Sequence, residues 1–69
     1  MKKRDLEKAI RAMAIQAGLE LIFVGGTKHD KFVIDRKNIL IPRHREINEL
    51  TAKSILNQVQ KYLDESGNK

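Results

Sequence analysis

Hydrophobic residues recur at helical spacing near the start of the chain. Apolar positions separated by three and four residues predict an amphipathic helix over about residues 4–17. Asp5 or a neighbour can cap the start of this helix, and Gly18 suits the left-handed conformation that ends many helices. The residues of the apolar stripe are Leu6, Ile10, Met13, Ala14 and Ala17.

The pattern then changes to alternation, which predicts three strands. We expect the first over residues 19–24, the second over residues 30–35 and the third over residues 38–41. Asp35 and Asn38 favour a tight antiparallel turn between the last two strands. In the first strand, the side chains expected to share one face are Leu19, Leu21 and Phe23.

Helical spacing returns after the polar residues 43–49. Asn48 can cap a second helix. The apolar face of this helix consists of Ala52, Ile55, Leu56, Val59 and Leu63. We expect a single domain over residues 1–63, followed by a flexible tail over residues 64–69.

The predicted order of elements, α-β-β-β-α, defines an α+β fold with a three-stranded antiparallel sheet. Each helix has one apolar stripe and the sheet needs one covered face, so both helices should pack on the same side. This arrangement is that of double-stranded-RNA-binding domains, although a fold alone does not establish a function. If Phe32 and Ile34 face the core, alternation places His29, Lys31 and Val33 on the open face or its edge.

The charge of the chain narrows the classes of partner. The 69 residues carry a formal net charge of +5, and residues 28–45 alone contribute +4. Such a basic block either contacts nucleic-acid phosphates or keeps a small protein soluble. The chain has no cysteine and no apolar run long enough for a signal peptide or a membrane span, so we expect a cytoplasmic protein without membrane contact.

One segment combines the residue types needed for chemistry on RNA. Gly25 and Gly26 allow the backbone to approach a phosphate, and the amides of these two residues and Thr27 can donate hydrogen bonds to it. His29 follows, and an ordinary imidazole titrates near neutral pH, so it can act as a general base or acid. Lys28 and Lys31 can neutralise phosphate oxygens on either side of it. Another reading of the segment is a tight reversal between strands that carries a surface histidine.

Other candidate residues are weaker. Arg43 is a candidate phosphate ligand, and His44 is either a second histidine of the site or a structural residue that holds the start of the second helix. The sequence has neither the histidine spacing of a zinc site nor a nucleotide-binding loop, so we expect no metal and no small-molecule cofactor. Phe23, Phe32 and Tyr62 fit core or helix positions better than base-stacking positions.

Three segments together resemble the HicA toxins, small ribonucleases of bacterial and archaeal toxin–antitoxin pairs. They are KRDLEK at residues 3–8, GGTKHD at residues 25–30 and IPRHREINE at residues 41–49, and the similarity continues through residue 56. The resemblance implies a double-stranded-RNA-binding-domain-like fold and cleavage of messenger RNA without a metal. It also implies one essential histidine, which corresponds to His29, and neutralisation by a HicB antitoxin encoded beside it.

Two further classes of function stay open at this point. A noncatalytic RNA-binding module would use the same basic surface without cleaving its ligand. A protein that acts chiefly through its partner would use the basic residues to bind an acidic antitoxin. Cleavage of RNA in the presence of a chelator distinguishes the first reading from these two.

Overall fold

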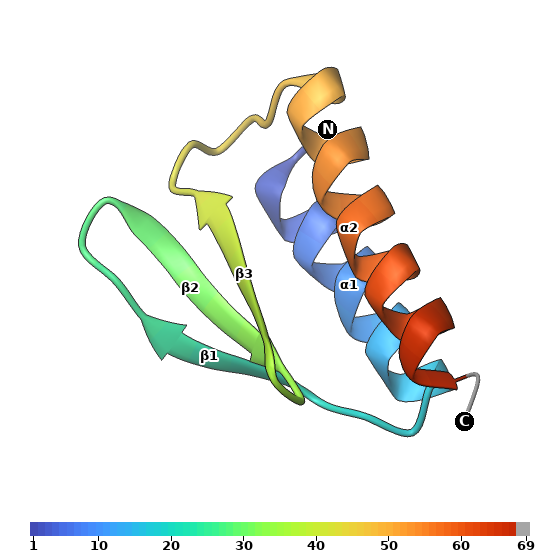
Figure 1. Cartoon of the computed structure of the whole chain (residues 1–69). Helices are drawn as coiled ribbons and strands as arrows, with labels where there is room; N and C mark the ends of the chain where they lie inside the picture. The colour runs from blue at the N-terminus through green and yellow to red at the C-terminus, as the bar shows by residue number, and fades with distance from the viewer. Residues whose placement is uncertain (68–69) are drawn as a thin grey trace.

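The computed structural model describes residues 1–67, which form two helices and one three-stranded antiparallel sheet. Both helices lie side by side on one face of the sheet, and the other face is open (Figure 1). The predicted α-β-β-β-α order is therefore confirmed. In chain order the elements are α1 (Lys3–Gln16), β1 (Leu21–Gly25), β2 (His29–Ile34), β3 (Lys37–Pro42) and α2 (Glu49–Gly67).

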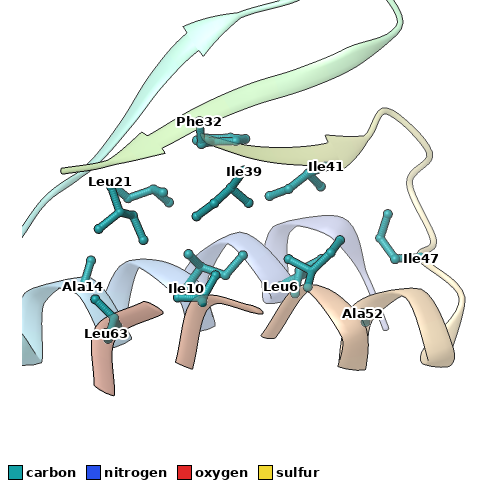
Figure 2. Packing of buried hydrophobic residues seen from close by; sticks show 13 residues of the cluster. Leu6, Ile10, Ala14, Leu21, Phe32, Ile39, Ile41, Ile47, Ala52 and Leu63 are labelled. Carbon is teal, nitrogen blue, oxygen red and sulfur yellow. The ribbon is translucent and has the colours of Figure 1, made fainter. Parts of the chain in front are cut away.

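The core lies between the sheet and the two helices. Alternate side chains of the strands, such as Phe32 and Ile41, point toward the helices (Figure 2). They pack against Leu6, Ile10 and the other buried residues of the helices. Full burial of one such side chain stabilises the fold by about 1.5–3 kcal/mol. The predicted stripes of both helices supply this core, except that Ala17 is exposed and that Met13 and Leu56 are only partly buried.

The helix ends follow the sequence in part. The backbone amide of Leu50 donates to Asn48 Oδ1 at 2.8 Å, so the predicted cap of α2 is confirmed, and Gly18 has the expected positive φ of 74°. The predicted cap at Asp5 is wrong, because α1 begins at Lys3 after a residue that makes no side-chain cap bond, and Asp5 lies in the first turn. Neither helix in the described part of the chain has the length and apolar character required to cross a membrane.

The expected tail after residue 63 needs correction. The helical backbone of α2 continues through Gly67, and residues 68–69 lie outside the described part of the chain. One side chain of the last turns is fixed by the sheet: the Tyr62 hydroxyl donates to Asp35 Oδ2 at 2.8 Å and accepts from the Arg36 amide at 3.4 Å. The helix therefore contacts the β2–β3 turn through Tyr62, and its backbone continues past Leu63, the last residue of its apolar stripe.

The hairpin itself is tighter than expected. Strand β2 ends at Ile34 and β3 begins at Lys37, so only Asp35 and Arg36 form the turn. Asp35, not Asn38, adopts the positive φ of 55°, which a short polar side chain tolerates best after glycine. The longer strands carry His29 into register with Pro42.

Phe23 departs from its predicted core position. It is directly opposite Phe32, and the two rings contact each other with centroids 5.2 Å apart, but Phe23 is 57% exposed. The reason is that the end of β1 extends away from both helices, which cover only its start at Leu21 (Figure 1). Ile22 and Val24 are also more than half exposed, and β1 is an edge strand of the sheet.

Candidate functional site

His29 lies at the start of β2, and its side chain is exposed. Phe32 and Ile34 of the same strand are buried against the helices, so His29, Lys31 and Val33 occupy the open face, as the alternation predicts. An imidazole in this position is accessible to a polymer that lies along the sheet.

The loop before His29 depends on its two glycines. Gly25 has a φ of 103°, and the register of the β1–β2 pair shifts at this residue. Gly26 lies so close to the following strand that a Cβ atom there would overlap the carbonyl oxygen of His29. Thr27 and Lys28 form the exposed tip of the loop. The double glycine therefore makes the tight reversal that the sequence allows and brings Gly26 against His29.

Arg43 anchors this loop from the end of β3. It directly follows β3, and its guanidinium donates from Nη2 to the carbonyl oxygen of Gly26 at 2.8 Å and from Nε to Asp30 Oδ1 at 2.9 Å. A guanidinium has five N–H donors, so this anchoring leaves others available for a ligand. The predicted phosphate ligand thus also has a structural role.

Asp30 joins this arginine to the first helix. The ammonium group of Lys3 donates to Asp30 Oδ2 and, at 2.6 Å, to Glu7 Oε2. Hydrogen bonds from Lys3 and then from Arg43 hold the pKa of the Asp30 carboxyl below its ordinary value. The pKa of Lys3 is raised, mainly by its hydrogen bond to Asp30 and then by its hydrogen bond to Glu7. At neutral pH a charged network therefore ties α1, β2 and the residues after β3 together.

A shallow groove of about 430 Å³ runs beside the imidazole of His29, between β3 and α2. Its sides are largely apolar, and they include Leu40 and Leu50, which are 56% and 78% exposed. Hydroxyl and amide groups from α2 stand among them. The groove is lined by His29, Leu40, Pro42, Leu50, Thr51, Ser54, Ile55 and Gln58. Such a surface fits a flat group with an apolar face and a polar edge.

The structure does not bring every predicted residue to this groove. Lys31 is half-buried on the central strand, opposite Leu40, so its backbone position lies next to the groove. His44 is exposed in the segment after Arg43 and, among the described residues, does not line the groove. Within residues 1–67, no three His, Asp or Glu side chains gather in a way that could hold a metal ion.

Sequence reasoning missed the residues that complete the surroundings of His29. Lys3 is separated from Asp30 by 27 residues, and no local pattern indicates their contact. Gln58 lies on a helix face that appears merely solvated in the sequence, and only the packing of α2 beside β3 places it in the groove. The exposed Leu40 and Leu50 lie together in the groove, and a contiguous exposed apolar patch is a signal of binding that only the folded structure shows.

Comparison of the chain with family models, with curated proteins and with solved structures finds no match. The chemistry of the site must therefore be argued from its own groups. An exposed imidazole, a groove with polar and apolar walls, and a loop that carries Lys28 are suited to proton transfer on an anionic polymer.

Proposed function

We propose that the protein is a metal-independent endoribonuclease, an mRNA interferase of the HicA type. The observation that carries the proposal is the exposed imidazole of His29, which shares a groove with α2 and follows a loop anchored by Arg43. The three segments similar to HicA toxins support it, because all three meet in space here. Arg43 of the third segment donates to Gly26 and Asp30 of the second. Lys3 of the first segment also donates to Asp30.

The reaction uses the nucleophile that RNA itself carries. The 2′-hydroxyl attacks the neighbouring phosphorus, the bond to the 5′-oxygen breaks, and a 2′,3′-cyclic phosphate and a free 5′-hydroxyl remain. One proton leaves the 2′-oxygen and one reaches the departing 5′-oxygen. His29 carries one of these protons, water exchanges the other, and general acid–base catalysis of this kind contributes roughly 10²–10⁴ in rate.

The residues around His29 have supporting roles in this proposal. Lys28 and Lys31 offset the charge that develops on the phosphate oxygens, and the amides of the Gly25–Thr27 turn donate hydrogen bonds to it. A base next to the reacting linkage lies in the groove against Leu40 and Leu50, with Gln58 at its edge. Single-stranded RNA presents its bases in this way, whereas a duplex does not.

The proposed setting is the cytoplasm, with messenger RNA as substrate and a HicB-like antitoxin as inhibitor. The antitoxin covers His29 and the basic strand face directly, because a chain of 69 residues offers little surface for a separate control site. Substitutions at Lys28, Lys31 and Arg43 should then weaken inhibition.

Cleavage of RNA in EDTA by the parent protein, His29→Ala and His44→Ala tests the proposal. His44→Ala is the matched control, since both histidines are exposed and lie near the same end of β3. We expect the parent and His44→Ala to cleave single-stranded RNA and to arrest growth on induction, and His29→Ala to do neither. Equal cleavage by His29→Ala would remove His29 from the mechanism.

A noncatalytic RNA-binding module is the second candidate. The observation that favours it is that, among the described residues, only one histidine lines the groove, so the site lacks the second histidine of a paired acid and base. Under this alternative the parent protein binds RNA without cleaving it, and His29→Ala changes the affinity only modestly.

A further inference from the structure

A second hollow, of about 540 Å³, opens beside the start of α1 and is distinct from the groove next to His29. Its walls come from the first turns of α1 and from the segment after β3, which are some 40 residues apart in the chain. It is lined by Lys2, Lys3, Arg4, Glu7, Arg43 and Arg45. Five cationic side chains thus share one surface with a single carboxylate.

Backbone hydrogen bonds hold the two walls of this basic hollow together. The amide of Lys3 donates to the carbonyl oxygen of Arg45 at 2.9 Å, and the amide of Ile47 donates to that of Met1 at 2.7 Å. Ile47 is itself buried in the core. The backbone positions of the cationic residues are therefore fixed by the fold, and Asp30 adds a side-chain link between Lys3 and Arg43.

The charges in the basic hollow are only partly balanced. Lys3 and Arg43 are paired with Asp30, and Lys3 also with Glu7. Within residues 1–67, Lys2, Arg4 and Arg45 form no salt bridge. Cations held close together repel one another unless an anion comes between them, so the hollow is suited to an anionic ligand.

We infer that the basic hollow binds a phosphate group of the RNA backbone, beside the linkage that His29 acts on. This inference rests on the proposed function and adds a second binding subsite to it. Arg43 carries the argument, because it lines the hollow and also donates to Gly26 and Asp30, which lie on either side of His29 in the chain. A strand whose phosphate reaches Arg43 therefore lies next to the loop that holds the imidazole.

The chemistry of the lining favours a polymer over a small molecule. Sites for small ligands are mostly apolar with a few polar groups, whereas every side chain that lines this hollow is charged. Arginine is also the residue that best matches phosphate, through paired N–H donors, and Arg4 and Arg45 are both exposed here.

The salt dependence of RNA binding tests the inference. The probe is an oligonucleotide of 2′-O-methyl RNA, which has no free 2′-hydroxyl and therefore binds without being cleaved. Arg4→Gln/Arg45→Gln removes two cations from the basic hollow. The matched control, Arg11→Gln/Arg36→Gln, removes the same charge from α1 and the β2–β3 turn, outside it.

Each phosphate contact to a single strand contributes about 0.7 to the slope of log affinity against log salt concentration. Loss of two contacts should flatten this slope by about 1.4, so between 50 and 200 mM salt the parent should lose about sevenfold more affinity than the hollow variant does. The control variant should keep the slope of the parent. An equal slope in all three proteins, with circular dichroism showing them folded, would overturn the inference.

Two further arms separate the possible failures. If the parent does not cleave unmodified RNA but the slopes differ as expected, the proposed function is wrong and the phosphate site is supported. If the parent cleaves RNA but the slopes are equal, the proposed function is supported and the phosphate site is wrong. Inorganic phosphate is the other probe: amide shifts confined to residues 2–4 and 43–45, together with equal slopes, would show a site for small anions and overturn RNA as the ligand.

Discussion

Gly26 is the position at which one methyl group tests the geometry of the candidate site most directly. A Cβ atom at this residue would overlap the carbonyl oxygen of His29 and stand 3.3 Å from its carbonyl carbon. Both are backbone atoms, so no side-chain rotation relieves the overlap. The oxygen is the closer of the two atoms and lies far inside the packing distance of about 3.5–4.0 Å, so Gly26→Ala must push the loop and the start of β2 apart by at least about 1 Å.

The displacement has two measurable consequences. Overpacking of this kind costs about 1–3 kcal/mol in the free energy of unfolding, which urea denaturation followed by circular dichroism measures. The carbonyl oxygen of Gly26 also moves relative to its donor on Arg43, so the anchor of the loop is weakened. A misplacement of about 1 Å at a reacting group can lower a rate by about 10²-fold, and we expect a loss of this size in kcat/KM for RNA cleavage.

Gly18→Ala is the control that separates stability from placement. Gly18 has a φ of 74°, with no atom within 4 Å of a Cβ built there, so alanine strains the backbone without a clash. A left-handed alanine costs about 1–2 kcal/mol, close to the loss expected for Gly26→Ala. Gly18 lies between α1 and β1, and Figure 1 shows that the connection between these two elements is at the other end of β1 from the β1–β2 loop. Gly18→Ala should therefore unfold more easily and still cleave RNA at the parent rate.

The reasoning is refuted if Gly26→Ala unfolds at the same urea concentration as the parent and keeps its cleavage rate. A second measurement does not depend on catalysis. Hydrogen exchange should quicken at the amides of Lys28 to Lys31 in Gly26→Ala and stay unchanged there in Gly18→Ala. Unchanged exchange in both variants would show that the loop absorbs the methyl group without moving His29.

Three other predictions concern the stability of the fold. Lys3 and Arg43 hold the pKa of Asp30 below its ordinary value of 3.8, so the stability that this carboxylate contributes is present above that pH and lost as the pH falls through the lowered value. Asp30→Asn should therefore unfold at a lower urea concentration than the parent at pH 7, and the difference between the two midpoints should become smaller below about pH 4. A difference between the midpoints that does not change with pH would contradict the pairing. Tyr62→Phe removes the hydroxyl that bonds to the β2–β3 turn and should cost about 0.5–1.5 kcal/mol, measured by the same denaturation, while Tyr62→Phe made together with Asp35→Ala should cost less than the sum of the two single changes. Ile10 is fully buried, so Ile10→Ala should lower the free energy of unfolding by about 2–5 kcal/mol, whereas Ile15→Ala on the exposed side of the same helix should change it by less than about 0.5 kcal/mol.

Hydrophobic spacing was sufficient to predict the elements of this fold, because each helix and strand buries one face. The stripe of α1 and the alternation of β2 are clear in the sequence, and both are buried as expected. Phe23 shows the limit of this pattern. Alternation predicts the face of the sheet on which a side chain lies, but it does not predict how far the helices extend over that face, and Phe23 is exposed.

The candidate site was less accessible to sequence reasoning. The local sequence indicated His29 and the glycine loop, because these residues are neighbours in the chain. The contacts of Asp30 with Lys3 and Arg43 join residues 27 and 13 positions away, and they arise only when the sheet packs beside the start of α1. Long-range ion pairs leave no periodic signal, because any exposed acid and base have similar local surroundings.

The exposed end of β1 has a consequence for handling the protein in solution. An edge strand presents unpaired amide and carbonyl groups, and Leu21–Gly25 carries no charged side chain to deter a second chain from adding to it. Apolar segments of this kind are where ordered aggregates begin once a protein is concentrated or partly unfolded. Val24→Lys would place a charge on this edge and is a suitable substitution for keeping concentrated samples monodisperse.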